Sequence, residues 1–65
     1  MLRWDTRSRK KVENAKADNF INDIIKVCKT HDLSLSHEDF HGAFQIDSFK
    51  SRNIEWLKRA HVKGE

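Results

Sequence analysis

The chain has 65 residues, one cysteine and a formal net charge of +3 at pH 7. This length suits a single small domain with a marginal core. One cysteine excludes an intrachain disulfide and a cysteine cage for zinc, and no apolar run is long enough for a signal peptide or a membrane span. We therefore expect a cytoplasmic protein that does not associate with membranes.

Basic residues gather towards both ends of the chain. Residues 1–16 hold six Lys or Arg against two acidic residues, residues 17–49 hold two against six, and residues 50–65 hold five against two. The net charges of these segments are therefore +4, −4 and +3. A basic end can contact phosphate groups or an acidic protein surface, or it can simply stay solvated, and the sequence leaves these interpretations open.

Residues 1–10 show no hydrophobic periodicity and are predicted to form a flexible basic arm ahead of a single domain over residues 11–65. Apolar residues recur at three- and four-residue spacings from residue 11 to residue 30, which predicts an amphipathic helix. The expected core face of this helix is Phe20, Ile21, Ile24, Ile25 and Cys28. On this face Cys28 should behave as a small buried apolar side chain.

Apolar and polar residues alternate over residues 33–36 and again over residues 43–47, which predicts the two strands of a β-hairpin. Pairing Leu33 with Ile46 and Leu35 with Phe44 places all four apolar side chains on one face. Residues 38–41 are then left for the turn.

A second helix is predicted over residues 50–61, with Ile54, Leu57 and His61 on one face and Gly64 near its end. Trp56 lies about 200° round this helix from Ile54. It is therefore expected either at the edge of the core or in a contact surface.

The predicted fold is a small α+β domain of helix, strand, strand and helix, with one two-stranded antiparallel hairpin. Such a domain buries little apolar area and leaves strand edges open. Pairing of two copies would remedy this, through extension of the sheet to four strands or through helix packing at Trp56. We expect a homodimer.

Residues 37–41 spell H-E-x-x-H, the signature of zinc peptidases. In such enzymes the two histidines lie one helical turn apart and bind one zinc, while the glutamate activates its water. The alternating residues on both sides favour a hairpin tip over a helix here, so we expect no catalytic residue and no cofactor. Zinc binding through His37 and His41 is kept as an alternative.

Nucleic-acid binding is a further alternative, because the predicted arm and the second helix supply many phosphate partners. The candidate residues for this function are Arg3, Arg7, Arg9, Lys10, Lys11, Lys58 and Arg59. No helix-turn-helix, zinc-finger or RNP motif that would read a sequence is present.

Residues 20–61 resemble a group of small, largely uncharacterised proteins of phages and prophages. The resemblance is carried by residues 33–39 (LSLSHED), 41–44 (HGAF) and 53–57 (NIEWL). It implies an accessory product of infection that acts without catalysis, by binding and blocking a host or defence component in the cytoplasm of an infected or lysogenic bacterium.

The expected partner is a host protein or a nucleotide-like ligand. The residues expected to contact it come from the hairpin tip, the second helix and the arm. They are His37, Glu38, Asp39, His41, Trp56 and Trp4.

Overall fold

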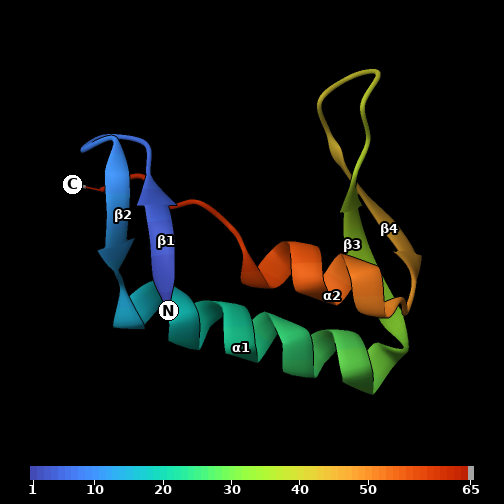
Figure 1. Ribbon diagram of the computed structural model, residues 1–65. Helices are drawn as coiled ribbons and strands as arrows, with labels where there is room; N and C mark the ends of the chain where they lie inside the picture. The colour runs from blue at the N-terminus through green and yellow to red at the C-terminus, as the bar shows by residue number, and fades with distance from the viewer. Residues whose placement is uncertain (65) are drawn as a thin grey trace.

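Two β-hairpins lie at opposite ends of a pair of helices in the computed structural model, which describes residues 1–64 (Figure 1). Strands β1 (Leu2–Asp5) and β2 (Lys10–Glu13) form the first hairpin, and helix α1 (Ala15–His31) leads to the second. The second hairpin consists of β3 (Leu33–His37) and β4 (Phe44–Ser48), and helix α2 (Ser51–Lys58) then packs against α1. The fold is thus a small α+β domain of order β-β-α-β-β-α, and within residues 1–64 no helix has the length and hydropathy to cross a membrane.

The first hairpin occupies the segment predicted to be a flexible arm, and this prediction is corrected. Residues 2–5 form an antiparallel strand in which Trp4 pairs with Lys11. The carboxylate of Asp5 organises the turn, because it accepts the backbone N–H groups of Arg7 at 2.9 Å and of Ser8 at 3.4 Å. Aspartate in this position is a favoured turn residue.

Arg3 joins β1 to both helices from a buried position. Its side chain is 3% exposed, and its Nε donates to Asp18 of α1 at 2.7 Å. Its Nη1 donates to the carbonyl oxygens of Lys58 and Ala60 at the end of α2 and just beyond it. This guanidinium group fixes the first hairpin to both helices, and backbone hydrogen bonds of Trp4 and Thr6 with Val62 join the hairpin to the segment after α2.

Helix α1 begins at Ala15 rather than at residue 11, because the residues before it belong to β2. Asn14 forms the N-cap, and its side chain accepts the backbone N–H of Ala17 at 2.9 Å. Such a cap satisfies one of the N–H groups that the first helical turn leaves without an intrahelical partner. His31 lies in the last turn of the helix.

Only one stripe of α1 is buried. Ile21, Ile25 and Cys28 pack with two residues of α2 to form the core, which confirms the predicted burial of Cys28. Phe20 was expected on the same face but is 64% exposed, and Ile24 is only partly buried. Neighbouring positions differ by about 100° round a helix, so Phe20 points away from the side that α2 covers.

The second hairpin forms as predicted, but its register differs. Leu35 faces Ile46 rather than Phe44. The N–H of Glu38 donates to the carbonyl of Ala43 at 2.8 Å and adds a pair beyond the strands, so the turn lies at residues 39–42 rather than 38–41. A register shift of two residues keeps every side chain on its predicted face.

The two faces of the second hairpin have different surroundings. Asn53 of α2 meets the polar face, where its Nδ2 donates to Ser34 Oγ at 3.0 Å and to Asp47 Oδ2 at 3.2 Å. Ser34 is 1% exposed. On the apolar face, in contrast, Phe44 is 70% and Ile46 68% exposed. The hairpin therefore attaches to the domain through these polar contacts and through Leu35, which packs against the core, and it leaves Phe44 and Ile46 largely in solvent.

Helix α2 is shorter at both ends than the helix predicted over residues 50–61. Ile54 and Leu57 are buried as predicted, but His61 lies beyond the helix and is exposed. Gly64 does not end the helix. Its N–H donates to Asp5 Oδ1 at 3.0 Å, and a Cβ at this position would lie 2.6 Å from Asp5 Oδ2. A side chain at this position would therefore require the Asp5 carboxylate to shift.

Candidate functional site

The tip of the second hairpin, residues 37–43, is held in one shape by Glu38. Its carboxylate accepts the backbone N–H groups of Phe40 at 2.6 Å and of His41 at 2.8 Å. These bonds, with that of His41 first, hold the pKa of Glu38 below its usual value. Gly42 follows with a φ of 69°, in the left-handed region that favours glycine. The tip is therefore a loop organised by its own residues.

The prediction that H-E-x-x-H lies at a hairpin tip is confirmed. His37 ends β3, and residues 38–43 are not helical. Nδ1 of His37 lies 2.7 Å from Asp39 Oδ1, and Nδ1 of His41 lies 3.2 Å from Glu38 Oε2. A carboxylate oxygen only accepts hydrogen bonds, so Nδ1 of each imidazole is engaged by a residue of the tip itself. The carboxylate of Glu38 is bonded to its own loop rather than directed at a shared metal position.

A zinc site at the tip would need ligands from elsewhere. Within residues 1–64 no group of three or more His, Cys, Asp or Glu side chains is arranged to hold a metal ion. Structural zinc sites have four ligands, and catalytic sites have three from the protein. His37 and His41 could supply at most part of such a set.

Phe40 lies in the tip but is not among the contact residues predicted from the sequence. It is 95% exposed, the highest value among the large apolar side chains of the part of the chain that the structure describes. Its neighbour His41 lies with its ring centroid 6.2 Å away. The available signal was a phenylalanine at a turn position where small or polar residues are usual.

Trp56 lies on the side of α2 that faces β3, and its ring centroid is 6.5 Å from that of His37. It is 41% exposed. The structure therefore brings Trp56 together with the base of the tip, as the predicted contact surface requires. Trp4 lies in the other hairpin, at the far end of the helices (Figure 1), so it is not part of the same surface.

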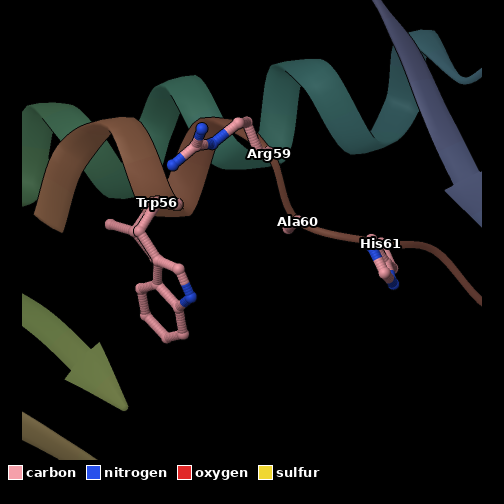
Figure 2. Close-up of a pocket in the computed structure, with 5 residues that line it drawn as sticks. Trp56, Arg59, Ala60 and His61 are labelled. Carbon is pink, nitrogen blue, oxygen red and sulfur yellow. The ribbon is translucent and has the colours of Figure 1, made fainter. Parts of the chain in front are cut away.

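An open hollow of about 420 Å³ lies beside Trp56, between the end of α2 and the segment that follows it. Figure 2 shows the Trp56 indole below α2, the Arg59 side chain above it against the helix, and the His61 imidazole farther along the chain. The cationic and aromatic groups thus do not converge on one point. The nucleotide-like ligand stays a prediction of the sequence.

The basic residues predicted to meet nucleic acid fall into three groups. Arg3 is buried in its ion pair with Asp18 and cannot reach a phosphate, which corrects its assignment. Lys58 pairs with Glu55 at 3.3 Å, and Arg59 lies beyond α2. The remaining four gather at the turn of the first hairpin, are exposed, and form no ion pair with an acidic residue of the described chain, 1–64. They are Arg7, Arg9, Lys10 and Lys11.

Comparisons of the chain with protein-family models, with curated proteins and with solved structures give no match. The resemblance to phage proteins therefore stays a prediction, and function is argued from the geometry of the chain alone.

Proposed function

We propose that this chain is a non-enzymatic binding protein of phage type, which blocks a host or defence protein in the cytoplasm of an infected bacterium. The contact surface in this proposal is the tip of the second hairpin, residues 37–43, together with Trp56. The observation that carries the proposal is the 95% exposure of Phe40 on a loop that Glu38 holds in one conformation.

An exposed phenyl ring on this ordered loop does not contribute to the packing of the domain's core. It is, however, what an interface anchor requires, because aromatic side chains that fill a pocket contribute most to many protein interfaces. A loop that is ordered before binding also loses less conformational entropy on association. The tip is thus suited to insert Phe40 into a cavity of a partner.

The charged residues next to Phe40 indicate what charge the partner's surface should carry. Two acidic residues, Glu38 and Asp39, precede Phe40 in the tip, and the loop N–H groups lower the pKa of Glu38, which favours its ionised form. Complementary charges steer association and penalise wrong partners. The proposed partner therefore has an apolar pocket with a basic rim.

The substitution Phe40→Ala tests this proposal against Phe20→Ala. Both residues are exposed phenylalanines, at 95% and 64%, but Phe20 lies on α1 away from the tip. In affinity capture from bacterial lysate, Phe40→Ala should lose the partner, with a decrease in affinity of about 30-fold or more for an anchor worth at least 2 kcal/mol. Phe20→Ala should retain it. Equal capture by both variants would remove the tip from the contact surface.

We also propose that the chain acts as a homodimer. Within residues 1–64 the core contains only five buried apolar residues, whereas Val27, Phe44 and Ile46 are each more than half exposed. Small domains with so limited a core commonly gain stability from association.

Nucleic-acid binding is a second candidate function, favoured by the cluster at the first hairpin. Arg7, Arg9, Lys10 and Lys11 are exposed and unpaired with acids of residues 1–64, and Trp4 stands beside Lys11 as a candidate stacking surface. The hairpin holds these cations together without a cost in ordering, unlike a flexible arm.

This second candidate predicts binding to single-stranded DNA or RNA that weakens with salt. The double substitution Lys10→Gln and Lys11→Gln should reduce the slope of log K against log salt concentration by about 0.7 for each phosphate that is no longer neutralised. The matched control is Lys26→Gln with Lys29→Gln, which removes the same charge from exposed positions on α1. An identical loss of affinity in both double variants would indicate net charge rather than a site.

A further inference from the structure

The direction of the backbone groups along β4 follows from two hydrogen bonds at the ends of the second hairpin. The Glu38 N–H donates to Ala43 at 2.8 Å, and the Phe49 N–H donates to Asp32 at 3.2 Å. Hydrogen-bonded and non-hydrogen-bonded pairs alternate in an antiparallel ladder. The observed register then makes Gln45 a bonded partner of β3. The residues on either side of it, Phe44 and Ile46, therefore direct their N–H and C=O groups away from β3.

This outer edge of β4 is open. Both helices pack against β3, whereas within residues 1–64 the contact of α2 with β4 is the side-chain hydrogen bond from Asn53 to Asp47, which leaves the backbone of the outer edge uncovered. No side chain or loop of the described residues bonds to the backbone of Phe44 or Ile46 from outside the hairpin. The unpaired N–H and C=O groups of such an edge form a template for another strand.

At the C-terminal end of β4, the backbone N–H and C=O groups of Ser48 already have hydrogen-bond partners within the chain. Asp47 Oδ1 accepts the N–H of Ser48 at 2.8 Å, and the carbonyl of Ser48 accepts Ser34 Oγ at 2.6 Å. A strand that adds to this edge therefore finds free groups on Phe44 and Ile46 and not on Ser48. The free segment is short and has a defined register.

We propose that a second copy of the chain occupies this edge, with the two β4 strands antiparallel about a two-fold axis at Gln45. Phe44 then pairs with the partner's Ile46, and Ile46 with the partner's Phe44. This register uses every free group of both edges. The neighbouring register, with the axis at Ile46, would instead need the groups of Ser48 that are bonded within the chain. The inference deepens the homodimer of the proposed function and rests on it.

Side chains favour the same arrangement. Phe44 and Ile46 are 70% and 68% exposed on one face, so the pairing sets an aromatic against an aliphatic side chain across the dimer twice. Ile46 also lines an apolar groove of about 180 Å³ between α1 and the hairpin, together with Ile24 and Val27. The partner's Phe44 would stand at the mouth of this groove.

On the polar face of the sheet, this pairing creates no repulsion between like charges. Gln45 meets the partner's Gln45, which is neutral, and Asp47 meets the partner's Ala43. Like charges directly opposite one another destabilise a sheet, and none face each other here. The two tips point in opposite directions, so the dimer would present two copies of the proposed contact surface.

Cysteine cross-linking tests the axis. Gln45 forms a non-hydrogen-bonded pair with the partner's Gln45, whose Cβ atoms lie close enough for a disulfide. Under mild oxidation, Gln45→Cys should give at least about tenfold more covalent dimer than Ser36→Cys, whose copies lie roughly 14 Å apart across three strand spacings. Ser36 is the matched control because it pairs with Gln45 on the same face. The wild-type chain, whose one cysteine is buried, gives the background.

Each outcome is decisive when sedimentation of the uncross-linked proteins is measured alongside. Preferential cross-linking of Gln45→Cys with a dimeric wild type supports the inference. A dimeric wild type with no excess cross-linking of Gln45→Cys over Ser36→Cys would overturn the β4 edge and leave the homodimer in place. Stronger cross-linking of Ile46→Cys would overturn the register. A monomer at every concentration would overturn both the edge and the homodimer, while the role of Phe40 is judged separately by its own variant.

Discussion

The substitution Arg3→Ala should destabilise the protein by about 3 kcal/mol, because it removes a buried guanidinium group and leaves three partly buried acceptors without their charged donor. Arg3 Nε is 2.7 Å from Asp18, and Nη1 donates to two carbonyl oxygens near the end of α2. A domain of 65 residues has a stability of only about 3 to 10 kcal/mol at typical values per residue. The loss therefore approaches the lower end of the whole stability and should be visible as a lower midpoint in urea denaturation followed by circular dichroism.

Arg7→Ala is the matched control, since Arg7 is an exposed arginine of the same hairpin that forms no ion pair with an acid of residues 1–64. Its effect should stay within about 0.5 kcal/mol, as for most surface substitutions. If Arg3→Ala matched Arg7→Ala, the guanidinium would not hold the first hairpin to the helices. Both proteins must be compared at one concentration, because association adds to apparent stability.

The ion pair of Arg3 with Asp18 should also affect how the free energy of unfolding depends on pH under acidic conditions. The hydrogen bond from Arg3 and then that from the N-terminal amino group lower the pKa of Asp18 below its ordinary value of 3.8. A carboxyl whose pKa is lower in the folded state stabilises the protein above the unfolded pKa, and this contribution is lost as the pH falls through the folded pKa. Asp5 and Asp47 are shifted in the same direction. Stability should thus decline as the pH falls towards and below 3.8, and the decline should be shallower in Arg3→Ala.

The elements that the sequence predicted well are those with a clear hydrophobic period. Alternation revealed the second hairpin and its tip, and three- and four-residue spacings revealed α1. The register was wrong because Glu38 and Ala43 continue the ladder beyond the strands, which no side-chain pattern records. The position of the tip was predicted, but Phe40 was not assigned to the contact surface. Whether an aromatic side chain is exposed depends on which other parts of the fold cover it, and a local sequence pattern does not contain this information.

The first hairpin was missed because each of its strands has only four residues and charged side chains dominate them. Its stability comes from contacts that are remote in sequence, such as Arg3 with Ala60 and Gly64 with Asp5. An arginine among other basic residues resembles a solvated charge until its carboxylate and carbonyl partners are known. The same contacts removed Arg3 from the candidate phosphate ligands and separated Trp4 from the hairpin tip.

The second large loss of stability is expected for substitution of Ile25. The same experiment distinguishes Ile25 from Phe20, which the sequence pattern had placed on the same helix face. Ile25 is 7% exposed and packs in the core with α2, whereas Phe20 on the next stripe of α1 is 64% exposed. Ile25→Ala should cost about 2 to 4 kcal/mol through reduced burial and the cavity left behind. Phe20→Ala removes a larger side chain but should cost less than about 1 kcal/mol, because little of that ring leaves an apolar environment on truncation.

Urea denaturation at a fixed protein concentration measures both changes. The expected order, a larger loss for the smaller side chain, depends on α2 covering only the stripe of Ile21, Ile25 and Cys28. A loss at Phe20 as large as that at Ile25 would mean that Phe20 is covered in solution, which the isolated chain does not explain. Because the proposed β4 dimer axis lies in the second hairpin, such a result would indicate a second contact along α1 and would call for repeating the measurement at several protein concentrations.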